Sequence, residues 1–249
     1  AVIRLCRKYD VPYQVIGNGS NLLVGDRGIR GLVIEMLSKE DEICVEDDCI
    51  TVGAGMLLSK TANRAAEHGL TGMEFAAGIP GRIGGAVVMN AGAYGGEMKD
   101  ILTAVTVLDQ EGNEKILSAE ELELGYRTSC ILKKGYIVTG AKIKLKHGEE
   151  TAIRARMEEL KKQRVEKQPL EYPSAGSTFK RPEGYFAGKL IMDAGLRGYL
   201  VGEAQVSEKH CGFVINRGNA TAADVRTLMQ NVADIVEEKF GVRLEPEVK

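Results

Sequence analysis

The sequence predicts an α+β fold that is divided into more than one domain. Segments with the apolar alternation of β-strands are interleaved with amphipathic helical segments along the chain. A charged helical segment at 149–167 ends at Gln168-Pro169 and is typical of a connector between two domains. The length of 249 residues is compatible with this division, since it allows one large domain or two to three small ones.

Composition and charge exclude several classes of protein. The chain is 44% hydrophobic and 27% charged, which is typical of a globular protein with a sizeable core. Its net charge of −2 gives no basic field for nucleic acid, and no apolar run approaches the length of a membrane span. The five cysteines lack C-x-x-C spacing, and the three histidines are scattered. We therefore expect free thiols in a reducing cytoplasm, no metal site and no insertion into a membrane.

Two short strands flank a first glycine cluster. Residues 1–9 have the pattern of the end of an amphipathic helix without an initiator Met, so we expect an N-terminal truncation. Strands follow at 11–16 and 31–35. Between them, Gly17-Asn-Gly-Ser-Asn21 leads into the strand-like Leu22-Leu-Val24, whereas a Rossmann fingerprint leads into a helix. This loop is predicted to bind phosphate through its amides and its Asn and Ser side chains, with a plain β-turn as the alternative.

A second glycine-rich stretch, 78–96, is the most distinctive part of the sequence. It follows a helix at 56–68 that Gly69 ends. Seven of its nineteen residues are glycine, and the missing side chains allow backbone N–H groups to approach a ligand closely. Pro80 fixes one φ angle, and apolar residues at 83–89 anchor the stretch in a core. It is predicted to be a backbone-lined cradle for a flat or phosphorylated ligand.

The remainder of the chain alternates between strands and helices. After the glycine-rich stretch we expect a hairpin of 103–109 and 114–117, a short helix at 118–122, and strands at 131–132, 136–138 and 141–145. Beyond the connector helix lies a Pro-bounded loop, 172–182, that carries two serines. Helices follow at 187–194 and 222–240, with strands around 206, 212–216 and 244–249.

Six segments of the sequence, taken together and in order, resemble the UDP-N-acetylenolpyruvoylglucosamine reductase family. They span nearly the whole chain and are Gly17-Asn-Gly-Ser-Asn-Leu-Leu23, Gly78-Ile-Pro-Gly-Arg-Ile-Gly-Gly-Ala86, Asn90-Ala-Gly-Ala93, Tyr126-Arg-Thr-Ser129, Ala175-Gly-Ser-Thr-Phe179 and Glu245-Pro-Glu-Val-Lys249. The resemblance implies an FAD-binding domain of the vanillyl-alcohol-oxidase type in two subdomains, plus a C-terminal α+β substrate-binding domain. The implied boundaries are 1–36 rejoined by 243–249 for the first subdomain, 37–148 for the second, and 149–242 for the connector helix and substrate domain.

The resemblance also implies a reaction in peptidoglycan precursor synthesis. In this family NADPH reduces FAD, and the reduced flavin transfers a hydride to the methylene carbon of an enolpyruvyl ether on a UDP-sugar. A serine hydroxyl protonates the carbon beside the carboxylate, which gives UDP-N-acetylmuramate. No histidine or cysteine lies in either glycine loop, which argues against a covalent flavin. We expect a cytoplasmic monomer that binds non-covalent FAD, NADPH and a UDP-sugar.

Three residues match the catalytic positions of the family. Hydride addition beside a carboxylate builds enolate charge, which a hydrogen-bonding cation stabilises preferentially in the transition state. Arg127 matches this role and offers a planar fork for the carboxylate. Ser177 matches the proton donor, with Ser174 as the competitor in the same loop. Glu247 matches the glutamate that orients or stabilises the reacting centre, and Glu245 lies two residues away on the same strand face.

The same resemblance assigns binding residues. Both glycine loops would hold the pyrophosphate of FAD, and the segment that begins at Asn90 would lie near the isoalloxazine ring. The cofactor-binding residues are Gly17, Asn18, Gly19, Ser20, Asn21, Gly78, Ile79, Pro80, Gly81, Gly84, Gly85, Asn90, Gly92 and Ala93. Candidates for substrate binding, for which an ordinary surface role is the alternative, are Tyr126, Lys180, Lys189, Arg197 and His210.

Two other functions stay open on the sequence. One is another flavin oxidoreductase of the same fold, such as an oxidase of an alcohol or sugar. The three catalytic residues argue against it, because oxidation needs a base more than an acid. The other is a nucleotide-sugar-binding protein without catalysis. Within the family, Leu145 leads to the connector helix with little room for an inserted tyrosine loop, which indicates the shorter of two family types.

Overall fold

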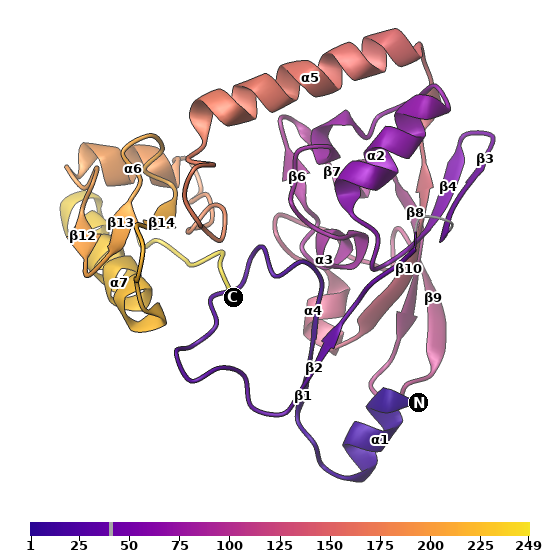
Figure 1. The fold of residues 1–249 in the computed structure, drawn as a ribbon, viewed down its shortest axis with the longest axis horizontal. Helices are drawn as coiled ribbons and strands as arrows, with labels where there is room; N and C mark the ends of the chain where they lie inside the picture. The colour runs from indigo at the N-terminus through magenta and orange to yellow at the C-terminus, as the bar shows by residue number, and fades with distance from the viewer. Residues whose placement is uncertain (40–41) are drawn as a thin grey trace. The chain divides into compact units, whose positions relative to one another are not determined.

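The computed structural model describes residues 1–39 and 42–249, which form two compact units (Figure 1). Unit 1 comprises Ala1–Gly19 and Arg30–Gln163, and unit 2 comprises Ser20–Ile29 and Arg164–Lys249. Both units contain helices and strands, which confirms the predicted α+β class. Among the described residues, no helix has the length and apolar character needed to cross a membrane.

Unit 1 is built on a five-stranded antiparallel sheet. Its order is β3 (Ile43–Glu46), β4 (Cys49–Gly53), β10 (Ile137–Lys144), β8 (Leu102–Leu108) and β9 (Glu114–Ser118). The register aligns Val52, Ala141 and Val105 across the three central strands, and all three are buried. Since side chains alternate across a strand, this row defines the core face of the sheet.

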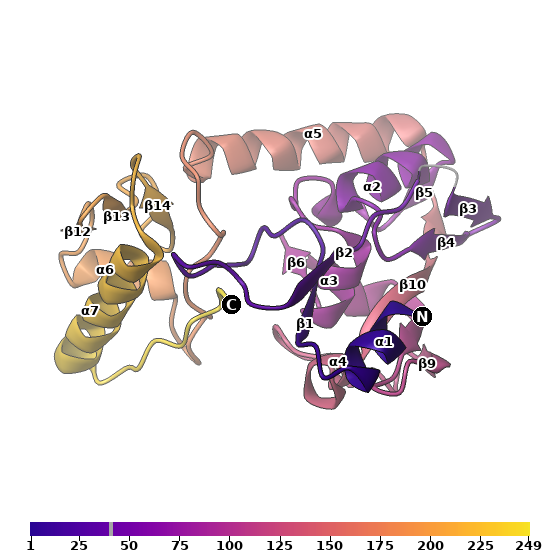
Figure 2. The same cartoon turned by 60° about the horizontal axis from the view of Figure 1, so that its bottom comes forward.

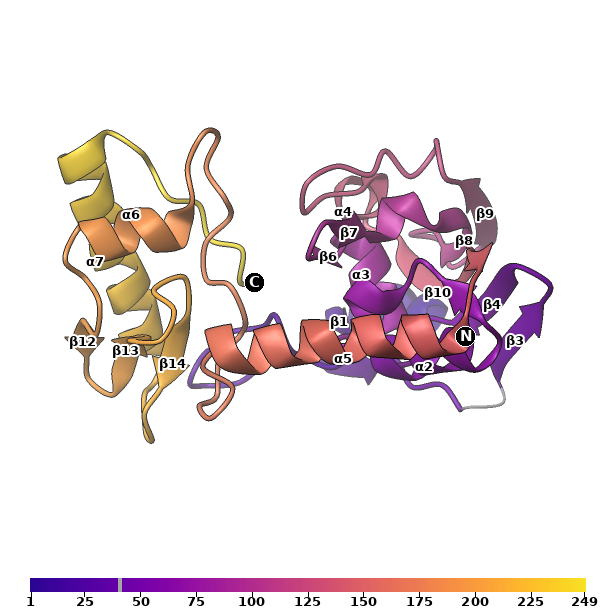
Figure 3. The ribbon, with the colours of Figure 1, turned by 90° about the horizontal axis from the view of Figure 1, so that it is seen from above.

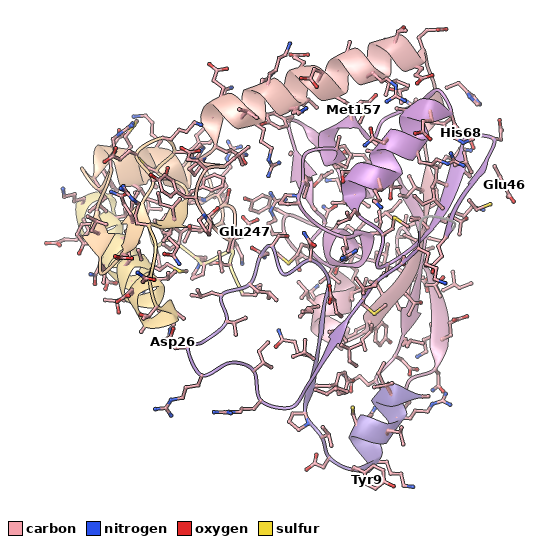
Figure 4. The ribbon with its side chains drawn as sticks, in the orientation of Figure 1. Tyr9, Asp26, Glu46, His68, Met157 and Glu247 are labelled. Carbon is pink, nitrogen blue, oxygen red and sulfur yellow. The ribbon has the colours of Figure 1, made fainter. Side chains whose placement is uncertain are left out.

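Helices pack around this core. They are α2 (Leu58–Glu67), α3 (Ile83–Val88), α4 (Cys130–Lys134) and α5 (Glu150–Lys167). Helix α3 contacts β10, while α5 runs alongside α2 (Figure 3). Ile153 and Leu160 of α5 are buried, and Met157 packs against the core of the unit from the side of α5 that faces α2 (Figure 4). Gly69 ends α2 with φ +63°, the left-handed conformation predicted for it.

Smaller elements complete unit 1. The pair β1 (Tyr13–Ile16) and β2 (Leu32–Glu35) is parallel, and α1 (Val2–Lys8) precedes it. β5 (Leu70–Thr71) pairs with β11 (Lys146–His147), and β6 (Gly92–Ala93) pairs with β7 (Gly96–Glu97). Two 3₁₀ helices, η2 (Glu74–Ala76) and η3 (Met98–Asp100), flank the glycine-rich stretch.

Unit 2 has a separate core beneath two helices and a small sheet. Helices α6 (Ala187–Asp193) and α7 (Ala222–Phe240) lie next to each other (Figure 2) and pack with the antiparallel strands β12 (Leu200–Val201), β13 (Ala204–Val206) and β14 (Val214–Asn216). The bounds of α7 match the predicted helix because its ends are marked locally. Thr221 and Asp224 form a capping box, and Gly241 closes the helix with φ +68°.

Residues 20–29 belong to unit 2 although the neighbouring chain on both sides belongs to unit 1. Asp26 accepts hydrogen bonds from the backbone N–H of Ala222, at 2.7 Å, and of Ala223, at 3.2 Å, at the start of α7 (Figure 4). Leu23 N–H donates to Lys249 O at 2.7 Å. This segment is therefore attached to unit 2 at two points.

Four predicted segments differ in the structure. Residues 131–132 lie in α4 rather than a strand, because Gly135 closes a short helix whose Cys130 and Ile131 are buried. Residues 119–122 form a turn after Ser118, the last residue of β9. The side-chain bonds of a capping box between Ser118 and Glu121 are present, but no helix continues from them. The segments 22–24 and 244–249 make isolated backbone bonds and a single bridge instead of regular strands.

The division into units also differs from the predicted domain boundaries. Most of the connector helix belongs to unit 1, because its apolar side packs there. Residues 243–249, predicted to rejoin the first FAD subdomain, belong to unit 2, where their backbone pairs with residues 21–23 and 178–180. Unit 1 thus contains most of both predicted FAD subdomains.

Candidate functional site

The two glycine loops meet within unit 1. Asn18 Nδ2 donates a hydrogen bond to Pro80 O at 2.9 Å, so the side chain of one loop holds the backbone of the other. A Cβ added at Gly17 would lie 3.4 Å from Arg82 Cβ, which is already a close contact. Loops separated by some sixty residues in sequence are therefore neighbours, as a shared phosphate site requires.

Not all amides of the second loop are available to a ligand. The N–H groups of Ile79, Gly81 and Gly84 donate to Ala76 O, Ile79 O and Ala54 O at 3.1, 2.8 and 2.8 Å. Gly85 differs, because its N–H bonds to no described residue and a Cβ placed there would meet nothing within 4 Å. Glycine at 84 fits the fold itself, since a Cβ would come within 3.1 Å of Ala54 Cβ. The open backbone at Gly85 is the part of this loop that fits a phosphate.

Arg82 adds a positive charge between the loops, and sequence reasoning missed it. Its Nη1 donates to Gly55 O at 2.6 Å, and its Nη2 lies 3.8 Å from Glu35 Oε1. Its Nε is buried without a hydrogen-bond partner among the described residues. A buried donor that lacks an acceptor is costly, and a diphosphate oxygen is a suitable acceptor for it. The available signal was an arginine within the predicted phosphate loop.

Ser20 and Asn21 lie with unit 2. Asn21 O accepts the N–H of Lys249 at 3.0 Å, and Asn21 Nδ2 donates to Glu247 O at 3.2 Å. The Asn21 side chain, predicted to bind the cofactor, therefore holds the backbone of the predicted catalytic glutamate.

The segment after α3 holds Arg127 in unit 1. Arg127 Nη2 donates to Gly92 O at 3.3 Å, and its guanidinium lies 5.2 Å from the centre of the Tyr126 ring. Glycine is required at 92 by the β6–β7 pairing, because a Cβ would lie 2.7 Å from Glu97 Cβ and from Gly96 O. The paired residue Ala93 lies opposite Gly96. The structure thus brings the predicted carboxylate-binding arginine next to a predicted cofactor segment.

Asn90 was predicted to be a cofactor-binding residue in the segment near the isoalloxazine ring, and its side chain is bonded within the protein. It is fully buried and its carboxamide is hydrogen-bonded to Glu97, Lys99 and Gly125. A carboxamide that is occupied by the protein has no donor left for a flavin. Only the backbone of Asn90 is left for a ligand.

Ser177 and Glu247 lie on neighbouring segments of unit 2. Phe179 and Pro246 form an antiparallel bridge, beside which Glu247 N–H donates to Thr178 O at 2.9 Å. On the other side, Ser177 bridges Phe213, and Thr178 Oγ1 accepts the N–H of Val214 at 2.9 Å. Thr178 and Phe179 are buried while Ser177 is exposed, so the ladder presents the serine at the surface of the unit.

Ser174 and Glu245, the competitors of Ser177 and Glu247, lie on the same two segments. Ser174 is exposed and precedes the residues that pair with 245–247. The carboxylate of Glu245 forms an ion pair with Lys180, at 3.0 Å between Nζ and Oε2. This pair also engages the Lys180 ammonium, one of the predicted substrate contacts.

The other predicted substrate contacts in unit 2 have protein partners too. Lys189 pairs with Asp193 at 2.7 Å on α6, and Arg197 donates to the backbone oxygen of Glu208. His210 Nδ1 accepts the N–H of Gly212 at 3.1 Å, and its ring stacks edge-on to Phe213. Desolvation of this ring lowers the pKa of His210, so the imidazole is neutral near pH 7 and offers an N–H donor rather than a positive charge.

Comparison with known proteins identifies the family to which this chain belongs. The profile of the UDP-N-acetylenolpyruvoylglucosamine reductase C-terminal domain matches residues 168–249, and that of an FAD binding domain matches residues 1–118. The reductase of Agathobacter rectalis is 59% identical, over 100% of this chain and 83% of its own. The chain belongs to the UDP-N-acetylenolpyruvoylglucosamine reductase family. The UDP-N-acetylenolpyruvoylglucosamine reductase of Caldanaerobacter subterraneus is also similar, at 54% identity over 100% of this chain and 82% of its own.

A solved structure agrees with this assignment. The crystal structure of the UDP-N-acetylenolpyruvylglucosamine reductase of Thermus caldophilus matches with a TM-score of 0.83 at 42% identity, covering 98% of this chain and 87% of the other. Membership of the family confirms the predicted fold class, FAD as the cofactor and a reductase as the activity. It selects the reductase over the oxidase and over a binding protein without catalysis.

Proposed function

We propose that this reductase uses NADPH to convert the enolpyruvyl ether of UDP-N-acetylglucosamine enolpyruvate into UDP-N-acetylmuramate, as a monomer in the cytoplasm. When bound, FAD accepts a hydride from NADPH and passes it to the substrate. The observation that carries the proposal is the hydrogen bond from Arg127 to the Gly92 carbonyl, within the glycine-rich stretch 78–96. It supports a carboxylate-binding group beside the cofactor segment, which an enolpyruvyl substrate requires.

In this proposal the loops of unit 1 hold the cofactor. The loop from Gly17 to Gly19, the open backbone at Gly85 and the guanidinium of Arg82 would bind the diphosphate of FAD. An arginine between two glycine loops suits this task, because charge-assisted bonds to phosphate are about twice as strong as neutral ones. The remaining residues of the loop from Gly78 to Gly85 would support these contacts through the backbone.

Arg127 would bind the carboxylate of the substrate. Addition of a hydride to the methylene carbon moves electron density onto this carboxylate, so the guanidinium stabilises the transition state more than the ground state. Removal of one such electrostatic group from an active site typically slows the reaction by about 10² to 10³. Binding of the UDP-sugar would involve the remaining candidates, Tyr126, Lys180, Lys189, Arg197 and His210.

Ser177 would donate the proton and Glu247 would orient the reacting centre. The hydroxyl gives its proton to the carbon beside the carboxylate, so hydride and proton together saturate the double bond. The exposed position of Ser177, at the end of a ladder whose neighbouring residues are buried, supports this role. The hydrogen bond from Glu247 N–H to Thr178 O supports a fixed separation between the segments that carry Ser177 and Glu247.

Separation of the two half-reactions tests the proposal. Under anaerobic conditions, NADPH should bleach the flavin of the full chain, and the enolpyruvyl substrate should restore its absorbance. Ser177→Ala should leave bleaching intact and slow the second step by orders of magnitude, with Ser174→Ala as the matched control. A slow Ser174→Ala with a fast Ser177→Ala would assign the proton to Ser174, and no reoxidation of the wild type would reject the substrate.

A further inference from the structure

The buried carboxamide of Asn90 connects two parts of unit 1 that carry separate functions. Asn90 Nδ2 donates to Glu97 Oε2 at 2.9 Å and to Gly125 O at 3.0 Å, while Asn90 Oδ1 accepts the N–H of Lys99 at 2.9 Å. Both of its donors are used, and no part of the residue is exposed. The first partner lies in the β6–β7 hairpin, and the second opens the turn that contains Arg127.

The backbone by itself does not require asparagine at this position. Asn90 follows the last turn of α3 with φ +43°, and the bonds from Asn90 N to Val87 O and from Ala91 N to Ala86 O are those of a Schellman motif. Glycine is the residue with the lowest cost at such a site. The chain uses Gly135 after α4 and Gly241 after α7. What asparagine adds is the set of side-chain bonds.

Arg127 occupies a strained turn that these bonds hold. The turn is closed by Gly125 N–H to Thr128 O at 3.1 Å and by Thr128 N–H to Gly125 O at 3.3 Å. Arg127 is its third residue and has φ +53°, a left-handed conformation that is unfavourable for a residue other than glycine. A long side chain in this conformation persists only when its surroundings fix the turn.

The same short segment supports the turn at three points. Asn90 binds the Gly125 carbonyl, Gly92 O accepts the guanidinium of Arg127, and Val88 O accepts Ser129 Oγ at 2.7 Å. All three contacts come from residues 88–92, at the exit of the glycine-rich loop. A shift of this segment would therefore move Arg127 with it.

We propose that Asn90 is a positioning residue for Arg127. Its carboxamide fixes the turn that aims the guanidinium, and so sets the place of the substrate carboxylate relative to the cofactor segment. This inference rests on the proposed role of Arg127 in binding that carboxylate. It gives Asn90 a function that its buried side chain can perform without touching the cofactor or the substrate.

The test compares variants of the full chain loaded with FAD. Glu97→Gln is the matched control, because it keeps an acceptor for Asn90 Nδ2 and leaves the bond to Gly125 intact. In the double variant Asn90→Asp with Glu97→Gln, the amide introduced at position 97 can donate a hydrogen bond to the carboxylate introduced at position 90. The bond to Gly125 is lost, because a carboxylate oxygen then faces the Gly125 carbonyl oxygen. Arg127→Met removes the group that is positioned. FAD affinity, flavin reduction by NADPH and reoxidation by the enolpyruvyl substrate are measured for each.

The control should match the wild type in all three measurements. The double variant should bind and reduce flavin normally but reoxidise roughly ten- to a hundredfold more slowly, as expected for a reacting group displaced by up to about 1 Å. In the Arg127→Met background the same two substitutions should cause no further slowing, because nothing is left to position. Asn90→Gly, which suits the left-handed backbone, should show the same selective loss.

Several results would overturn the inference. If the two substitutions slowed flavin reoxidation in the Arg127→Met background by the same factor as in the wild type, Asn90 would act independently of Arg127. Loss of FAD binding in both Asn90 variants would mean a purely structural role. A slow Arg127→Met with a double variant at the wild-type rate would refute the inference alone. Arg127→Met at the wild-type rate would refute the proposed role of Arg127 and this inference together.

Discussion

Asp26→Ala should destabilise unit 2 at the start of α7 and at the contact between residues 20–29 and the C-terminal segment, which are far apart in sequence. Asp26 is the acceptor for the first two N–H groups of α7, at 2.7 and 3.2 Å. The capping box of Thr221 and Asp224 satisfies other groups at this helix end and does not replace Asp26. The substitution therefore leaves two helix N–H groups without their acceptor and removes a negative charge from the positive end of the helix dipole.

The magnitude follows from these two losses. Removal of a side-chain acceptor at a helix N-terminus costs about 1 kcal/mol, and loss of the favourable charge at a helix end costs about 0.3–1 kcal/mol. We therefore expect Asp26→Ala to lower the free energy of unfolding of unit 2 by about 1.3–2 kcal/mol. Asp26→Asn removes the charge and one of the two acceptor oxygens but keeps the other, so it should lose less than the alanine variant, roughly 1 kcal/mol.

Urea unfolding followed by hydrogen exchange of individual amides measures this effect. Exchange should accelerate in the first turns of α7, and also at Leu23 N–H and Lys249 N–H, because residues 20–29 lose one of their two attachments. Exchange in the five-stranded sheet of unit 1 should not change. Equal losses for the alanine and asparagine variants would refute the contribution of the acceptor, an asparagine variant as stable as the wild type would refute the charge argument, and unchanged exchange at Leu23 would refute the attachment.

Three further predictions concern unit 1. Arg82→Met should weaken FAD binding by roughly ten- to a hundredfold in a flavin fluorescence titration, the loss expected for one charged hydrogen bond; an unchanged Kd would contradict a contact between Arg82 and the diphosphate. Gly92→Ala should destabilise the β6–β7 hairpin by about 1–3 kcal/mol through overpacking against Glu97, measured by thermal unfolding; an unchanged Tm would refute this contact. Hydrogen bonds from the backbone N–H of Asn113 and from Lys115 hold the pKa of Asp109 at about 2 instead of 3.8, so the stabilisation by this carboxylate is present above pH 3.8 and is lost as the pH falls through about 2. The stability difference between wild type and Asp109→Asn should shrink over this range in acid unfolding, and a difference independent of pH would contradict the assignment.

The sequence by itself determined the elements whose signals are local. The apolar period and the end residues of α7 lie within the helix and next to it, so its bounds follow from the residues themselves. Gly69 ends α2 for the same reason. The two glycine loops and the order of the family's segments are also properties of the sequence, and they were sufficient for fold class, cofactor and activity.

The tertiary structure decided what depends on partners distant in sequence. Residues 131–132 became helical because neighbouring side chains are buried, which a short apolar run does not reveal. Asn90 and Asn21 were predicted as ligand contacts on residue type, and burial and hydrogen bonding turned their carboxamides toward the protein. An amide side chain has the same chemistry on a ligand and on a backbone carbonyl, so only its surroundings decide which of the two it binds.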